Sequence, residues 1–158
     1  MLDFTTSARC PSRPLFGFIA GFLATLVFHQ LTLALLWGAG LAPFGPFQTA
    51  PTQPFGVPAV LSLAFWGGVW GIAYALVDRR FFPQGNAYWS TAFGFGAILP
   101  SLVALLVVLP LKGKALGGGW QPGLLVTVLL VNGAWGVGTG LILDWLGRRC
   151  PRAPTRGT

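Results

Sequence analysis

The chain of 158 residues is 54% hydrophobic and 8% charged, and its formal net charge is +7 at pH 7. These proportions lie far from those of globular domains, so they exclude a water-soluble enzyme and leave no basic soluble surface for nucleic acid. The apolar residues form four stretches, at about 15–38, 59–77, 91–111 and 123–146. Each stretch approaches the ~20 residues that cross ~30 Å of hydrocarbon as a helix. We therefore predict an all-α membrane protein with four transmembrane helices.

The charged residues lie between and outside these stretches. We place a cytoplasmic N-terminal tail at 1–14, a transmembrane domain at 15–146 and a basic cytoplasmic C-terminal tail at 147–158. One predicted side of the membrane carries the arginines Arg9, Arg13, Arg79, Arg80, Arg148, Arg149, Arg152 and Arg156. The other side carries only Lys112 and Lys114. Because cytoplasmic segments are enriched in Lys and Arg, we predict that both termini are cytoplasmic.

The first stretch combines a row of small residues with two polar residues near its middle. Gly17, Gly21 and Thr25 recur at intervals of four, and such rows let helices pack closely within lipid. His29 continues this row, so we expect it to face the bundle, with Gln30 beside it. The loop that follows, at 41–58, is uncharged and contains Pro-Phe-Gly twice. These residues favour turns, and we expect the loop to lie in the outer interface or to cover the helix ends.

The second and fourth stretches resemble each other in their small residues and in their charged ends. The rows are Gly67, Gly71 and Ala75 in the second stretch, and Asn132, Gly136 and Gly140 in the fourth. Asp78 directly precedes two arginines, and Asp144 stands four residues before Arg148. We expect both acids to form local ion pairs, because residues four apart on a helix are neighbours.

The third stretch has its own row and an internal proline. We expect Gly94, Ala97, Ser101 and Ala104 to line one side of this helix. Pro100 leaves a carbonyl without its helical partner and favours a kink.

The two halves of the chain look duplicated. Phe-Gly-Phe opens the first and third stretches at 16–18 and 93–95, and Gly-x-Trp-Gly occurs in the second and fourth at 68–71 and 133–136. Two hairpins that enter from the same side would form a parallel repeat, related by an axis along the membrane normal. Chance similarity between helices rich in glycine and aromatic residues is the alternative.

Polar or irregular features of the four helices fall at similar depths, and we define them as a candidate polar layer. Its members are His29, Gln30, Trp66, Ser101 and Asn132. The leading interpretation is hydrogen bonding between helices. A path for a polar solute or proton is one alternative, and binding of haem or a chlorophyll-type pigment by His29 is another. The layer lacks the ligands of a metal site, and the sequence shows no catalytic set, so we predict no enzyme activity, metal or cofactor.

The basic C-terminal tail offers a second candidate site. Arg148, Arg149 and Arg152 could hold anionic lipid headgroups, or they could serve only to fix the topology.

The strings LVFHQ, PFGVP, AFWGGVWG, LPLKG and NGAWG resemble those of short uncharacterised bacterial integral membrane proteins with four spans. The resemblance implies a bacterial inner membrane but no activity. The sequence thus favours a non-enzymatic protein that packs in the bilayer with itself or with a larger complex. A small transporter or channel component, or a haem- or pigment-binding subunit, remains the alternative.

Overall fold

The computed structural model describes residues 12–149 of the chain. Within this part, the helices long and apolar enough to span a membrane are Arg13–Gly38, Ala59–Phe81, Asn86–Leu111 and Pro122–Arg148. This finding confirms the prediction of a helical multi-pass membrane protein. The second and third helices run about four to five residues beyond the apolar stretches at 59–77 and 91–111. A helix can continue past the ~30 Å hydrocarbon core into the headgroup region, so hydropathy alone does not mark its end.

The first and third spans each contain a π-helical segment. The first runs as α1 (Arg13–Ala24), a π segment (Thr25–His29) and α2 (Gln30–Gly38). In the π segment the Gln30 N–H bonds to the Thr25 carbonyl, five residues back. The Thr25 hydroxyl donates to the Gly21 carbonyl at 2.9 Å, a bond within a helix that often accompanies bending.

The third span runs as α4 (Asn86–Val103), a π segment (Ala104–Val108) and α5 (Leu109–Leu111). Pro100 lies inside α4, as the sequence indicated, and the π segment begins one turn after it. The other two spans are the uninterrupted helices α3 (Ala59–Phe81) and α6 (Pro122–Arg148).

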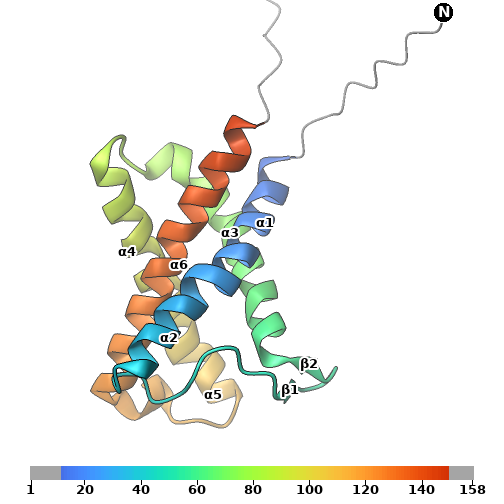
Figure 1. Cartoon of the computed structure of the whole chain (residues 1–158), viewed down its shortest axis with the longest axis vertical. Helices are drawn as coiled ribbons and strands as arrows, with labels where there is room; N and C mark the ends of the chain where they lie inside the picture. Colours follow the sequence, from blue (N-terminus) through green and yellow to red (C-terminus); the bar gives the residue numbers. More distant parts are fainter. Residues whose placement is uncertain (1–11, 150–158) are drawn as a thin grey trace, which may run out of the picture.

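Two loops lie at one end of the bundle. The longer loop includes the short antiparallel strands β1 (Pro51–Thr52) and β2 (Val57–Pro58). The shorter loop contains a 3-10 turn at Leu116–Trp120, where three consecutive glycines have positive φ. We call this the loop end (Figure 1). The opposite end, where the described chain begins and finishes, is the basic end, with Arg13, Arg79, Arg80, Arg148 and Arg149.

The helices pack mainly in three pairs. α1 lies along α3, α4 lies along α6, and α1 also contacts α6. In Figure 1 the first span crosses in front of α6, so it joins the two halves of the bundle. Contacts between α3 and α4 are sparse by comparison. The bundle is therefore closed between α1 and α6 and more open between α3 and α4.

Close backbone contact joins α1 to α3, as the rows of small residues predicted. A Cβ atom added to Gly21 would overlap the carbonyl oxygen of Gly67, and one added to Gly71 would overlap that of Gly17. The Phe18 ring covers Gly68 in the same interface. Gly21 and Gly71 admit only glycine because the atoms they meet belong to the opposing backbone.

The contact between α4 and α6 has the same form but differs in part from the sequence prediction. A Cβ at Gly96 would overlap the carbonyl oxygen of Asn132, and one at Gly136 would overlap that of Ala92. Gly94, which we expected in the interface, faces open space instead. Residues two apart lie ~200° around a helix from each other, so the side that meets α6 includes Gly96 and excludes Gly94.

The buried core lies toward the basic end. Tyr74 and Ala20 are fully buried there, together with Ala92 and Leu143. Four aromatic rings gather around this point, with centroids 5.2 to 5.9 Å apart, and they belong to Tyr74, Phe82, Tyr88 and Phe95. This aromatic cluster fills the space between α3, α4 and α6 at their basic end.

Candidate functional site: the polar groups and the cavity at the basic end

The first polar pair of the predicted layer ties the long loop to the first span. Gln30 is buried and His29 nearly so, with exposed fractions of 2% and 8%. The Gln30 Oε1 atom accepts the Phe47 N–H at 2.7 Å, and its Nε2 atom lies 3.4 Å from the His29 Nδ1 atom. The loop at 41–58 thus folds onto the helix ends, which was one of the two arrangements we expected.

The second polar pair joins α4 to α6. The Asn132 amide donates to the Ser101 hydroxyl at 3.0 Å, and that hydroxyl donates to the Val128 carbonyl at 3.3 Å. Both bonds cross between the same two helices that meet at Gly96. Polar groups buried in lipid seek such partners, and each bond contributes ~1 kcal/mol.

Trp66, the remaining member of the predicted layer, lies apart from both pairs. Its side chain is 58% exposed, and its ring stands edge-on to Phe65 at 5.8 Å. Within residues 12–149, no hydrogen bond joins the two polar pairs, and no group of three His, Cys, Asp or Glu could hold a metal. The structure therefore places the five residues at three separate positions.

A further buried bond connects the two halves, and sequence reasoning missed it. The Trp135 indole N–H donates to the Gly21 carbonyl at 2.9 Å, from α6 to α1. Trp135 is 3% exposed, although it lies in the middle of a span. Its position away from the headgroup region, where tryptophan is enriched, was the available signal.

At the basic end, Asp78 takes a partner that the sequence did not indicate. Its carboxylate pairs with the guanidinium of Arg13 in α1, 65 residues away, and also accepts the backbone N–H of the neighbouring Arg79 at 2.7 Å. Arg13 also donates from Nε to the Ala75 carbonyl at 2.8 Å. The side chain of Asp78 is 7% exposed and that of Arg13 is 26% exposed. This ion pair fastens the start of α1 to the end of α3.

The second acid forms the local pair that its spacing predicted. Arg148 donates to Asp144 Oδ2 from Nε at 3.0 Å and from Nη2 at 2.6 Å. Arg149 instead lies over the Trp145 ring, 4.2 Å from its centroid. Arg152, the third predicted headgroup contact, lies outside the described residues.

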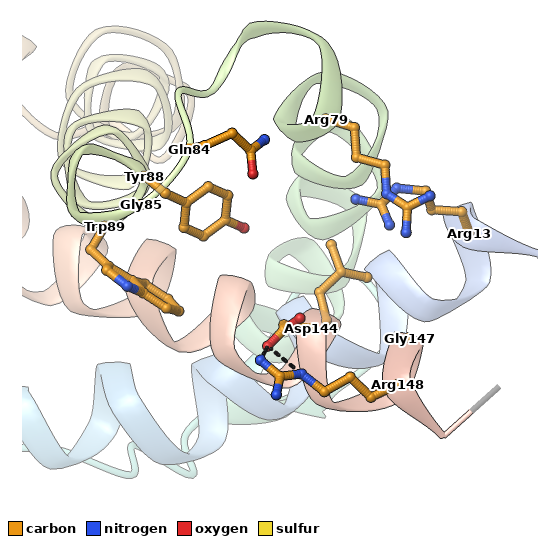
Figure 2. Close-up of a pocket in the computed structure, with 10 residues that line it drawn as sticks. Arg13, Arg79, Gln84, Gly85, Tyr88, Trp89, Asp144, Gly147 and Arg148 are labelled. Atoms are coloured by element: carbon orange, nitrogen blue, oxygen red, sulfur yellow. Dashed lines mark hydrogen bonds and ion pairs between the residues drawn. The ribbon is translucent and has the colours of Figure 1, made fainter. Parts of the chain in front are cut away.

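A cavity of about 510 Å³ opens among these groups at the basic end (Figure 2). Its charged lining consists of Arg13, Arg79, Asp144 and Arg148. Figure 2 shows Gln84, Tyr88 and Trp89 on the opposite side, from the start of α4 and the turn before it. The sequence indicated Arg148 alone among these residues, because the other groups converge only when four helix ends meet.

The aromatic cluster closes this cavity toward the membrane interior. Tyr88 lines the cavity, and its hydroxyl lies 3.1 Å from that of Tyr74 behind it. Tyr74 is fully buried, and Leu143, 3% exposed, forms another part of the lining. The cavity is therefore a recess at the helix ends.

Comparison of the chain with protein-family models, with curated proteins and with solved structures found no match.

Proposed function

We propose that this multi-pass membrane protein has a non-enzymatic role in the bacterial inner membrane, where it packs with itself or with a larger complex. The basic end faces the cytoplasm in this proposal, because it holds the arginines that flank the spans. The observation that carries it is the position of Trp66 on the outer surface of α3. Three observations support association: the exposure of this residue, the burial of its counterpart in the other half of the bundle, and the hydrogen bonds that the buried polar groups make.

Trp66 presents an indole N–H to lipid inside a span. It lies seven residues after the start of α3, or ~10 Å along the helix, and is 58% exposed. Within the described residues, its N–H has no hydrogen-bond acceptor. Leaving a polar N–H unpaired in hydrocarbon is unfavourable, typically by ~1–3 kcal/mol on protein scales. An acceptor from another membrane helix would remove this penalty.

The two halves of the bundle show what normally covers the Trp66 position. We infer that α1–α3 and α4–α6 are parallel repeats, because their contacts match residue by residue. The corresponding contacts are Gly21–Gly67 with Gly96–Asn132, Gly17–Gly71 with Ala92–Gly136, and Phe18–Gly68 with Phe93–Gly133. In this register Trp70 corresponds to Trp135, and Trp66 corresponds to Val131. Phe18 corresponds to Phe93, so the Phe-Gly-Phe strings at 16–18 and 93–95 lie two residues out of register, and only the Gly-x-Trp-Gly strings align.

The corresponding residues have different surroundings in the two halves. Val131 is 4% exposed and lies one turn before Trp135, whose indole N–H bonds to Gly21 of the first span. Trp66 is uncovered, because α4 makes only sparse contact with α3. The surface that α6 buries within the chain is therefore left free on α3, beside the open side of the bundle, and it is available to a second membrane helix.

The hydrogen bonds of Gln30 and Asn132 support a packing role over transport. The Gln30 side chain accepts a hydrogen bond from the long loop, and the Asn132 side chain donates one to Ser101. A polar pathway would connect such groups through the bundle, whereas these bonds hold the loop and the helices in place.

The test is the substitution Trp66→Phe, which keeps an aromatic ring and removes the N–H. Membranes that contain the protein are extracted in mild detergent, and the mass of the complex is measured by light scattering during size exclusion. We expect the wild-type chain to run as an assembly larger than one copy, and the variant to shift toward the single chain.

Trp37→Phe is the matched control. Trp37 is 56% exposed, close to the value for Trp66, but it lies at the end of α2, where headgroups and water accept its N–H. The control should keep the wild-type mass. A wild-type protein that runs as a single chain, or equal behaviour of both variants, would refute association through α3.

A further inference from the structure

The faces that α3 and α4 turn toward each other meet only near the basic end. The Trp70 ring stands edge-on to Phe95 there, with centroids 6.4 Å apart, and the two helices share few other contacts. One turn closer to the loop end, Trp66 and Leu99 are both exposed. Spacings of three and four residues place further exposed side chains on the same faces of the two spans. We define the α3–α4 face by the exposed residues Leu63, Trp66, Leu99, Leu102 and Leu106.

The α3–α4 face carries one hydrogen-bond donor without an acceptor. This donor is the indole N–H of Trp66, which makes no hydrogen bond within residues 12–149. The other side chains of the face are leucines, so none of them can accept a bond from it. The acceptor that Trp66 lacks must therefore be a backbone carbonyl or a group of another molecule.

The same face carries a backbone acceptor that lacks its helical donor. The third span continues as a helix through Pro110 to Leu111. Proline has no N–H, so Pro110 cannot donate to the Leu106 carbonyl, four residues earlier. Pro100 leaves the Gly96 carbonyl without its donor in the same way, but Gly96 is buried against α6. Leu106 is exposed, so another molecule can approach its carbonyl oxygen.

The donor and the acceptor lie at similar heights in the bundle. Trp66 lies seven residues after the start of α3, or ~10 Å from that helix end. Leu106 lies five residues before the end of the third span at Leu111, or ~8 Å from it. Both of these helix ends are at the loop end (Figure 1). Within one chain the two groups make no hydrogen bond, and α3 and α4 share few contacts.

A second copy of the chain supplies both missing partners. A two-fold axis along the membrane normal gives the two copies the same orientation in the bilayer and places equal heights opposite each other. When two α3–α4 faces meet around this axis, α3 of each copy lies opposite the third span of the other. Such an interface is isologous, so every contact occurs twice. The Trp66 N–H of each copy then faces the Leu106 carbonyl of the other copy.

We propose that the partner that covers α3 is a second copy of this chain, bound through the α3–α4 face with reciprocal hydrogen bonds from Trp66 to the Leu106 carbonyl. This inference rests on the proposed association through α3, and it names the molecule that associates. Leucine side chains surround the two hydrogen bonds in this interface. Helix packing and hydrogen bonds between helices drive association in lipid, and each bond strengthens it about fivefold.

Cross-linking between two singly substituted chains tests which surfaces meet. Both chains have Cys10 and Cys150 replaced by serine. One chain carries Leu63→Cys and one purification tag, and the other carries Leu106→Cys and a different tag. The chains are expressed together, and their membranes are treated with a bismaleimide of short span. We expect a cross-linked product that carries both tags.

Leu31→Cys replaces Leu106→Cys in the matched control. Leu31 is exposed and lies seven residues before the end of the first span at Gly38, a similar height, but it is outside the α3–α4 face. This pair should give no product with both tags. A product from Leu31→Cys and none from Leu106→Cys would place another surface opposite α3 and would overturn the inference.

The mass of the purified wild-type chain separates this inference from the association on which it rests. We expect twice the mass of one chain by light scattering. A larger assembly that gives no product between Leu63→Cys and Leu106→Cys would overturn the pairing and leave association through α3 intact. A wild-type protein that runs as a single chain would refute both.

A double-mutant cycle tests the reciprocal hydrogen bond. Pro110→Ala restores the N–H that can satisfy the Leu106 carbonyl within its own helix, so it should weaken the dimer about fivefold. Trp66→Phe removes both bonds and should weaken it about tenfold or more. The two substitutions together should weaken it no more than Trp66→Phe alone, because they act on the same bond. Energy transfer between chains that carry different dyes at Cys150, measured during dilution into detergent micelles, gives the dissociation constants.

Pro122→Ala is the matched control for Pro110→Ala. Pro122 is the first residue of α6, where a missing N–H leaves no helical carbonyl without its donor. This control should change the dissociation constant by less than about twofold. Equal effects of the two proline substitutions, or effects of Pro110→Ala and Trp66→Phe that multiply, would overturn the assignment of the Leu106 carbonyl. Thermal unfolding identifies a variant that fails to fold, and the cross-linking of exposed positions then decides the pairing.

Discussion

Substitution of two glycines on the same helix tests the packing of α4 against α6. Gly96→Ala places a methyl group where the Asn132 carbonyl oxygen and the backbone of Gly136 already lie. Backbone atoms cannot rotate away as a flexible side chain can, so the helices must separate. Overpacking of this kind destabilises by ~1–3 kcal/mol. Gly94→Ala adds the same methyl group two residues earlier, where nothing lies within 4 Å.

The two variants should therefore change the free energy of unfolding in opposite directions or by very different amounts. Alanine is favoured over glycine in helices by up to ~1 kcal/mol, so Gly94→Ala should be neutral or slightly stabilising. Both substitutions gain the same helix propensity, so the expected difference between the variants is the overpacking cost of ~1–3 kcal/mol. Unfolding by SDS in mixed micelles, followed by circular dichroism, measures both values. Equal stability of the two variants, or a less stable Gly94→Ala, would refute the assigned face of α4.

Two further substitutions test contacts that bring distant segments together. Gln30→Ala removes the acceptor of the Phe47 N–H, so chymotrypsin should cleave the loop at 41–58 about 5–30 times faster than in the wild type. Gln48→Ala, which removes an exposed hydrogen bond within the loop, should leave the cleavage rate unchanged. Equal cleavage of both variants would contradict the anchoring role of Gln30. Asp78→Asn should lower the free energy of unfolding by ~1–3 kcal/mol, less than for a fully buried pair because Arg13 is partly exposed. Asp144→Asn, in the exposed pair, should leave stability unchanged, and an equal loss in both variants would contradict the structure.

Local patterns of the sequence predicted the features that depend on one helix at a time. The four apolar stretches led to the four spanning helices, because bilayer thickness sets their length directly. The rows at Gly17 and Gly67 pointed to the interface between α1 and α3, because residues four apart share a helical face. The pair of Asp144 with Arg148 followed from the same geometry.

Features that depend on the rotation of one helix against another could not be read from the sequence. The row from Gly94 and the row that contains Gly96 are both rich in small residues, and only the neighbour in space decides between them. Trp66 matched the polar groups in approximate depth, but it lies on the exposed side of α3. Depth along a helix follows from residue counting, whereas facing direction requires the packed bundle.

Partners far apart in sequence were missed for a related reason. Arg13 and Asp78 lie near the ends of two different apolar stretches, and the arginines next to Asp78 were closer candidates. The cavity shows the same difficulty, since the starts of two helices, the ends of two others and a turn must meet before its lining exists. The sequence therefore singled out Arg148 as a site residue but not the groups that surround it.

The orientation of the bundle is tested most directly by labelling of single cysteines from one side of the membrane. In a chain whose Cys10 and Cys150 are replaced by serine, Gln48→Cys marks the loop end and Asn86→Cys marks the basic end, and both positions are exposed. A maleimide that cannot cross membranes is applied to intact spheroplasts and, separately, to permeabilised ones. We predict that Gln48→Cys reacts in both preparations and that Asn86→Cys reacts only after permeabilisation. Labelling of Asn86→Cys in intact spheroplasts would contradict a multi-pass protein whose basic end faces the cytoplasm.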